Sequence, residues 1–188
     1  LMLKGLDKLN TQLTAENKLP INIGIGLNTG DAVVGNMGSD QRFDYSCLGD
    51  AVNLAARLEG QTKGYGVKIL FGEETARNLS DKHTILELDK IAVKGKTEPV
   101  AIYTVLDPDV IGIHELPTVM QFVKLHMALR ESYRKQDWKH CKDCIDSLMG
   151  QFSGSLDSYY EIITDRIEEF KKNPPSKEWD GVYVATTK

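Results

Sequence analysis

The chain has 188 residues, 27% of them charged, and a formal net charge of −4 at pH 7. This length suits one domain, or one domain with a small appendage, and is enough to bury a core. The basic residues are scattered rather than gathered in the stripe that nucleic-acid binding requires, so we expect no nucleic-acid partner. No apolar run approaches the length of a membrane span, and we expect neither a signal peptide nor membrane contact by this segment.

The cysteines and histidines predict no metal or disulfide chemistry. Three cysteines do not suggest a disulfide scaffold, which favours a reducing, cytoplasmic setting. Cys141 and Cys144 have metal-like spacing but no second pair, and on a helix both would face one core. The histidines have no partner pattern, and we expect them at the surface: His83, His114, His126 and His140.

The first elements in chain order are a helix and two strands. Leucines at helical spacing predict an amphipathic helix over residues 1–18, which starts without a capping residue, as expected of a piece of a longer protein. Ile21 to Leu27 alternates as a strand, a turn follows, and Ala32 to Asn36 is predicted to pair back on it. Gly24 and Gly26 lie inside the first strand, so they favour close packing over a dinucleotide-binding turn.

The stretch from Arg42 to Gly60, RFDYSCLGDAVNLAARLEG, predicts an extended segment followed by a helix. Gly49 provides a turn, Asp50 is expected to cap the helix, and Gly60 is expected just beyond its end. Asn53 and Arg57 are four residues apart and would project from one helical face. The spacing alone favours two solvated polar residues on an outer face over a functional site.

Further strands and helices follow. We expect strands over Val67–Phe71, Thr84–Val93 and Val100–Leu106, and a helix over Glu73–Leu79. Lys94, Gly95 and Lys96 would form the turn between the last two strands, and Asp107-Pro108 would close the domain.

Residues 118–171 have helical periodicity, with breaks near Gln136-Asp137 and over Gly150 to Gly154. The spacing of Leu129, Tyr133, Trp138 and Cys141 resembles a tetratricopeptide helix pair. One such pair cannot bury its own core, so it should pack on the preceding domain or on a partner. The mixed charges of Glu161 to Lys172 indicate a solvated face. Beyond Pro174 we expect an extended tail that Trp179 and Tyr183 anchor to a surface.

Three blocks of the sequence resemble the class III nucleotidyl cyclases, the adenylate and guanylate cyclase catalytic domain. They are NIGIGLNTGDAVVGNMGS (Asn22 to Ser39), the Arg42–Gly60 stretch, and VKGKTEPVAIYTV (Val93 to Val105), in the order of the family. The resemblance implies an α+β fold: a ferredoxin-like cyclase sheet with helices over residues 1–108, incomplete at its N-terminus. A small α-helical extension would occupy residues 109–188.

The resemblance also implies a chemistry and a set of residues. In this family the 3′ hydroxyl of a nucleoside triphosphate attacks the α-phosphate, giving a 3′,5′-cyclic nucleotide and pyrophosphate. Asn53 would orient the ribose, Arg57 would stabilise charge on the α-phosphate, and Lys94 would bind the terminal phosphates, with Lys96 as an electrostatic helper. Ser46 stands at the base-reading position, where a hydroxyl permits adenine without excluding guanine. Cys47, one place on, is interpreted as a core residue.

Mg2+ or Mn2+ would be the cofactor, but the family's two metal-binding aspartates belong upstream of this chain. We assign none of the turn carboxylates of Asp31, Asp40 and Asp44 to metal. The parent protein is therefore expected to be a cytoplasmic adenylate cyclase acting on ATP, with a membrane anchor upstream left open, and the isolated chain to be inactive. The alternatives are a guanylate cyclase and a cyclase-like regulatory module without catalysis.

The family's active sites lie between two cyclase domains, so the expected partner is a second cyclase domain, most simply in a homodimer. An unpaired sheet edge and an uncovered apolar face from Ile21, Ile23 and Ile25 would also recruit another chain. The sequence does not indicate which signal regulates the enzyme.

Overall fold

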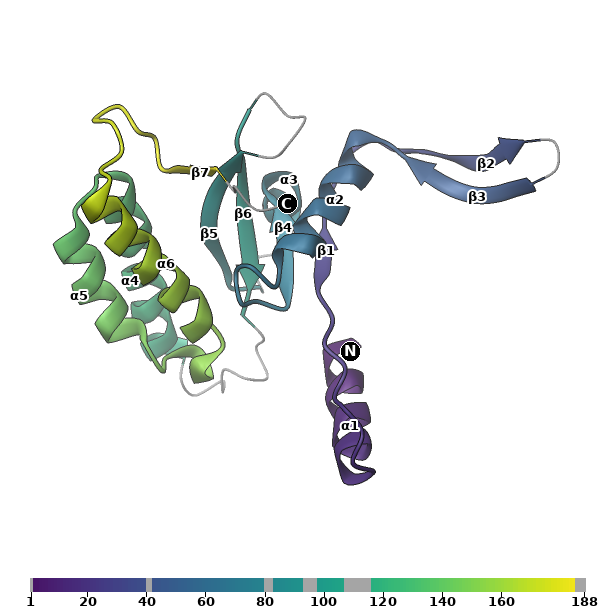
Figure 1. Cartoon of the computed structure of the whole chain (residues 1–188), viewed down its shortest axis with the longest axis horizontal. Coiled ribbons are helices and arrows are strands. Elements are labelled where there is room, and N and C mark those ends of the chain that lie inside the picture. Colours follow the sequence, from purple (N-terminus) through teal and green to yellow (C-terminus); the bar gives the residue numbers. More distant parts are fainter. Residues whose placement is uncertain (1, 40–41, 80–82, 93–97, 107–115, 185–188) are drawn as a thin grey trace.

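A computed structural model describes residues 2–39, 42–79, 83–92, 98–106 and 116–184. A central sheet carries α2 on one side and a C-terminal helical bundle on the other, while α1 and the β2–β3 hairpin project outward (Figure 1). No helix of the described part is long and apolar enough to cross a membrane. The helices are α1 (Met2–Ala15), α2 (Asp50–Gln61), α3 (Glu73–Asn78), α4 (Leu116–Arg134), α5 (Trp138–Leu148) and α6 (Asp157–Lys172). The strands are β1 (Ile25–Leu27), β2 (Val33–Ser39), β3 (Arg42–Leu48), β4 (Ile69–Gly72), β5 (Ile85–Ala92), β6 (Val100–Val105) and β7 (Val182–Val184).

The main sheet is mixed, with strand order β1-β4-β6-β5-β7. β1 runs parallel to β4 and β7 runs parallel to β5, whereas β6 is antiparallel to both of its neighbours. Helices cover this sheet, and a helical C-terminal part follows it, so the predicted α+β fold class is confirmed. The turn predicted at Lys94 to Lys96 and the domain end predicted at Asp107-Pro108 lie outside the described residues.

The predicted pairing of Ala32–Asn36 with Ile21–Leu27 is wrong. β2 pairs instead with β3 along seven residue pairs, from Val33 opposite Leu48 to Ser39 opposite Arg42. β1 is also shorter than predicted and begins at Ile25. At the start of the predicted strand, Asn10 of α1 binds both backbone groups of Ile21. Its side-chain amide donates to the Ile21 carbonyl and its side-chain oxygen accepts from the Ile21 N–H, each at 2.8 Å. A backbone bound in this way is not available to a sheet.

The two glycines of β1 and its approach serve close packing, as predicted. A Cβ at Gly26 would lie 2.1 Å from the Ala55 carbonyl oxygen, and one at Gly24 would lie 2.1 Å from Thr62 Oγ1. Side chains at these positions would push α2 away from the strand. The end of α2 differs from the prediction, because Gly60 lies within the helix and Thr62 is its C-cap. Asp50 is the first helical residue, and Gly49, the N-cap, has no side chain with which to cap the helix.

The C-terminal helices pack on the cyclase-like sheet, as expected of a unit that cannot bury its own core. One continuous core joins α2, β4, β5 and β6 to the three helices of the bundle; it includes Leu58, Leu88, Ile102, Leu129, Tyr159 and Ile163. The extended tail is confirmed, since Trp179 packs against Tyr133, Trp138 and Phe170 before the chain enters β7. Cys141 and Cys144 both lie in the core.

Three predictions of burial are wrong. Cys47 is exposed, because β3 belongs to the projecting hairpin and not to the core. His126 and Arg166 are buried, although they were expected at the surface and on a solvated face. Both occupy helix positions that face the sheet, where hydrogen bonds and an ion pair compensate for the loss of water.

Candidate active site

Helix α2 carries two of the four predicted site residues on its outer face. Asn53 and Arg57 are exposed, whereas Leu54 and Leu58 on the opposite face are buried at 4% and 0% exposure. Burying each leucine contributes about 1.5–3 kcal/mol, which fixes the rotation of the helix about its axis. The two polar side chains therefore project to the same side, separated by one helical turn.

The start of α2 is held by the turn that precedes it. The Asn28 side chain donates to the Ala51 carbonyl at 3.2 Å, and the Gly49 carbonyl accepts from the Asn53 N–H at 3.0 Å. Gly49 has φ +155°, and a Cβ there would lie 2.9 Å from the Asp31 carbonyl oxygen. Only glycine allows this close approach without strain. The backbone at Asn53 is thus positioned before any ligand binds.

Ser46 lies on β3, in the hairpin that leads into α2. It is half-buried and pairs with Gly35 of β2, where an added Cβ would meet nothing within 4 Å. The glycine leaves the strand surface beside the Ser46 hydroxyl bare, so that hydroxyl has room for a hydrogen-bonding ligand. Lys94, the fourth predicted residue, lies outside the described residues.

The described residues do not fit a divalent metal. They contain no group of three or more His, Cys, Asp or Glu side chains that could hold an ion. Asp31 and Asp44 are exposed, and Asp40 lies outside the described ranges. Mg2+ needs several oxygen ligands in near-octahedral geometry, which isolated carboxylates do not supply.

Comparisons with known proteins identify this arrangement. The family model of the adenylate and guanylate cyclase catalytic domain matches residues 1–107, more than half of the chain. The chain belongs to this cyclase family.

Individual relatives and solved structures are also similar to parts of this chain. An adenylate cyclase of Anabaena cylindrica is 44% identical over 112 residues, which are 56% of this chain and 22% of that protein. Among solved structures, the adenylyl cyclase CyaB from P. aeruginosa has 38% identity and a TM-score of 0.49, covering 55% of this chain and 53% of its own. The guanylyl cyclase Cya2 has 35% identity and a TM-score of 0.47, covering 54% and 50%. The chain thus spans less than a quarter of the length of the Anabaena relative.

This cyclase domain also contains a buried charge cluster that the sequence analysis missed. Asp89 of β5 is fully buried and accepts hydrogen bonds from Arg130 of α4 at 2.9 Å, Arg166 of α6 at 2.5 Å and Tyr65 at 2.7 Å. Burial raises the pKa of the Tyr65 hydroxyl, and the nearby Asp89 carboxylate raises it further, so Tyr65 remains a donor. The three donors compensate for the desolvation of the carboxylate.

A sequence signal for this cluster exists. Arg166 follows Tyr159 and Ile163 at helical spacing and precedes Phe170, so it occupies an apolar position of α6. Arg130 and His126 fall in the same way on the stripe of Val119, Val123 and Tyr133 in α4. Asp89 gives no such signal, because β5 also contains the charged residues Glu87 and Lys90. Charged residues at core positions indicate buried partners, although the pattern does not say which residues pair.

His126 is held neutral inside the domain. Its Nε2 lies 2.8 Å from the Glu87 carbonyl oxygen, which can only accept, so Nε2 carries the proton and Nδ1 accepts from the Tyr160 hydroxyl at 3.1 Å. Burial lowers the pKa of His126 to about 4, against the smaller raising effect of the Glu87 carbonyl. The ring therefore serves as a structural link between α4, α6 and β5.

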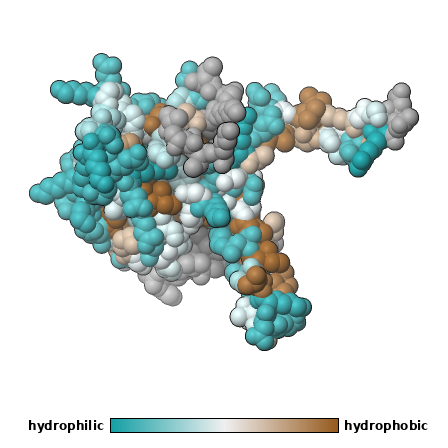
Figure 2. All heavy atoms as spheres, in the orientation of Figure 1, coloured by the Kyte–Doolittle hydropathy of each residue, from teal (hydrophilic) through white to brown (hydrophobic). Residues whose placement is uncertain are grey.

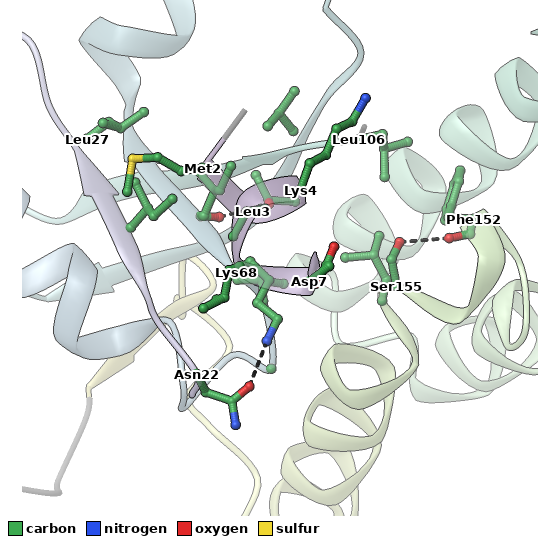
Figure 3. Close-up of a pocket in the computed structure, with 18 of the residues that line it drawn as sticks. Met2, Leu3, Lys4, Asp7, Asn22, Leu27, Lys68, Leu106, Phe152 and Ser155 are labelled. Atoms are coloured by element: carbon green, nitrogen blue, oxygen red, sulfur yellow. Dashed lines mark hydrogen bonds between the residues drawn. The ribbon is translucent and has the colours of Figure 1, made fainter. Parts of the chain in front are cut away.

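A large cavity of the described part lies away from Asn53 and Arg57. It has a volume of about 800 Å³ and is bordered by α1, the β1 edge and the connection between α5 and α6 (Figure 3). Its walls are mainly apolar, with Leu27 and Leu106 on the sheet, Phe152 on the bundle, and a hydrogen bond from Lys68 to Asn22 at the rim. Among the described strands, β1 pairs only with β4, so the expected open edge is present. Of the expected apolar face, Ile21 is exposed, whereas Ile23 and Ile25 are half-buried. This cavity carries no residue of the predicted active site.

Apolar side chains are also exposed on the projecting elements. Figure 2 shows hydrophobic surface along α1 and along the β2–β3 hairpin. On the hairpin, Val34, Phe43 and Tyr45 are 54%, 62% and 77% exposed, and their register places them on one face. Soluble chains rarely leave such a face uncovered unless it meets a partner.

Proposed function

We propose that this chain supplies the substrate-orienting part of a class III adenylate cyclase, which converts ATP to 3′,5′-cyclic AMP and pyrophosphate. The observation that carries the proposal is the paired presentation of Asn53 and Arg57 on the exposed face of α2. In this proposal residues 1–108 are the catalytic part and residues 109–188 are the helical extension. The tetratricopeptide resemblance of the extension remains a prediction.

Each residue has a separate role in the reaction. The 3′ oxygen of the ribose forms a bond to the α-phosphorus and loses its proton, while the bond from that phosphorus to the bridging oxygen breaks and pyrophosphate leaves. The Asn53 amide can hold the ribose by hydrogen bonds. The Arg57 guanidinium can donate to two α-phosphate oxygens as their charge grows. Among the described residues Arg57 has no ion pair, so its charge is available to a ligand.

The remaining roles concern the base and the terminal phosphates. The Ser46 hydroxyl would contact the base, and Lys94 would bind the β- and γ-phosphates as a point charge. Adenine is favoured over guanine because the Anabaena relative is named an adenylate cyclase. The family's metal ions would neutralise phosphate charge, but no step of this proposal runs through a metal bound by the described residues.

A second cyclase domain is the proposed partner. The apolar face of the hairpin, with Phe43 and Tyr45, and the open edge at β1 are the surfaces available to it. Burying such side chains between two copies would contribute about 25 cal/mol for each Å² of apolar area removed from water. We propose a homodimer in which the hairpin contributes to the contact.

The deciding experiment measures cyclic nucleotide formation by the purified parent protein, with ATP or GTP and with Mg2+ or Mn2+. Release of cyclic AMP from ATP supports the proposal. If cyclic GMP is formed from GTP and no cyclic AMP is formed from ATP, the parent protein is a guanylate cyclase instead. Absence of both products, in a folded protein that carries the family's upstream aspartates, would favour the regulatory-module alternative.

A further inference from the structure

Helix α2 packs against β1 and its flanks along a row of alternate residues from 24 to 30 (Figure 1). Three members of the row are glycines. A Cβ at Gly24 or Gly26 would lie 2.1 Å from an atom of α2 or of its C-cap, and one at Gly30 would lie 2.8 Å from Ala51 Cβ. Asn28 is the member of the row with a side chain, and its amide donates to the Ala51 carbonyl at 3.2 Å. Within this described row, that is the only hydrogen bond to α2.

The contacts along this row advance in step with the helix. Gly26 meets Ala55, and two residues later Asn28 meets Ala51, which is four residues earlier in α2. Two residues of extended chain span roughly 6.6 Å and four residues of α-helix span roughly 6 Å, so both contacts form at once. The buried leucines of α2 restrain its rotation, but apolar attraction is non-directional and opposes a slide along the axis only weakly. The hydrogen bond from Asn28 has a narrow range of length and angle, so it opposes that slide directly.

Asn28 is itself held at the end of the sheet. It directly follows β1, and the hydroxyl oxygens of the next residue, Thr29, and of Thr75 on α3 lie 3.0 Å apart in a hydrogen bond. The Asn28 side-chain oxygen lies against Gly72 at the end of β4, where an added Cβ would be 2.5 Å from it. The backbone of Gly72 is extended, with φ −81° and ψ 169°, a conformation that any residue adopts. The Asn28 amide, and not the backbone, therefore excludes a side chain at position 72.

From these contacts we propose that Asn28 is a positioning residue: it sets where α2 lies along its axis, and so where Asn53 and Arg57 meet the ribose and the α-phosphate. The proposal rests on the proposed function, in which those two side chains act on ATP. Ala51 precedes both of them in the same helix, so a shift at Ala51 moves all three together. Misplaced groups at the reacting atoms weaken transition-state contacts more than they weaken substrate binding. Loss of the Asn28 amide should therefore lower kcat and leave KM for ATP nearly unchanged.

The first test measures kcat and KM for ATP in Asn28→Ala, Asn28→Asp and Asn78→Ala variants of the parent protein. Asn78 is the matched control, because its amide also donates to a backbone carbonyl, that of Glu74 at 2.7 Å, but within α3. We expect Asn28→Ala to lower kcat about tenfold, equal to ~1.4 kcal/mol of activation free energy, and to change KM by less than about twofold. Asn28→Asp keeps the shape of the side chain but removes the donor, so it should lower kcat at least as much. Asn78→Ala should behave as the wild type.

A second variant, Gly72→Ala, disturbs the same hydrogen bond without changing Asn28. The added methyl group should push the Asn28 amide away from Ala51 and reproduce the fall in kcat. In the double variant with Asn28→Ala, the methyl group occupies the space that the amide has left, so the second substitution should cost no further activity. Falls in kcat that multiply in the double variant would show independent effects and would overturn the proposal.

Hydrogen exchange in the parent protein separates this proposal from the proposed function. Asn28→Ala should speed amide exchange in the first turns of α2, including the Asn53 N–H that binds the Gly49 carbonyl, and leave the C-terminal bundle unchanged. Unchanged kcat or unchanged α2 exchange in Asn28→Ala would overturn the proposal, as would a fall in kcat that matches a loss of folded protein on thermal melting. A wild type that forms no cyclic nucleotide would overturn the proposed function, and α2 exchange would then decide by itself whether Asn28 holds the helix.

Discussion

Asp89 and Arg166 are 77 positions apart in the chain and form an ion pair of 2.5 Å, in which the aspartate side chain is fully buried and the arginine side chain is 9% exposed. One residue belongs to the cyclase sheet and the other to the C-terminal bundle. Because a buried charge without its partner is costly, neither part can leave the other without a penalty. The helical extension is therefore an integral layer of the folded domain.

We predict that Asp89→Asn strongly destabilises the chain. The change leaves Arg130 and Arg166 buried without a compensating charge, which should lower the free energy of unfolding by about 3–5 kcal/mol. Asp180→Asn is the control, since its exposed ion pair with Lys90 should cost under about 1 kcal/mol. Urea unfolding followed by circular dichroism measures both. A similar decrease in the free energy of unfolding for the two variants would show that the buried cluster stabilises the fold no more than an exposed ion pair.

Stability should fall as the pH falls from about 6.5 to about 4. The folded pKa of His126 lies near 4 and the unfolded value near 6.5, so within this window the unfolded state binds a proton that the folded state does not. Above pH 6.5 both states are neutral and this contribution is complete. Below pH 6.5, the free energy of unfolding should fall by roughly 3 kcal/mol. Unfolding curves of the wild type and His126→Gln across this range decide the point, and an equal pH slope in the two proteins would contradict it.

Arg57→Ala in the parent protein should lower kcat about 10²–10³-fold, equal to ~2.7–4 kcal/mol, as for loss of one preorganised charge-stabilising donor. Binding of ATP should change much less, because the charge on the α-phosphate grows mainly in the transition state. Arg77→Ala on α3 is the matched control, because this exposed arginine pairs only with Glu73 and Glu74 among the described residues. Cyclic nucleotide release at saturating ATP is the measurement. Unchanged turnover in Arg57→Ala would exclude the assigned role.

The purified 188-residue chain should form no detectable cyclic nucleotide. Metal ions neutralise much of the phosphate charge in this family's reaction, and the described residues offer no matched set of ligands for them. The assay uses ATP with excess Mn2+ and the parent protein as its positive control. Robust product formation by the chain alone would show that its metal ligands have been misplaced.

In solution the chain should form a homodimer through the hairpin. The double variant Phe43→Asp with Tyr45→Asp places charge on the apolar face of β3 and should yield a monomer. Met127→Asp is the control, because Met127 is 63% exposed but lies on α4 of the bundle. Light scattering at micromolar concentration gives the masses. A monomeric wild type, or a dimer that persists in the double variant, would refute the contact.

Local sequence patterns were sufficient to predict much of this protein's structure. Helical periodicity placed Asn53 and Arg57 on one face of α2, opposite Leu54 and Leu58, because that geometry depends only on residue spacing. The three sequence blocks indicated the cyclase family, and a repeat-like unit too small for its own core correctly predicted packing on the preceding domain. Gly24 and Gly26 were correctly assigned to close packing for the same local reason.

Long-range partners were decided only by the tertiary structure. Residues 32–36 could pair with either neighbouring strand, and in the structure they pair with β3, while β1 pairs with β4. His126 and Arg166 were expected at the surface, because a polar side chain is usually exposed unless a distant part of the chain supplies a buried partner. Asp89 of β5 is such a partner for Arg166. Spacing along the chain determines which side chains share a face, whereas the partner that a buried polar group meets is determined by how the completed elements pack.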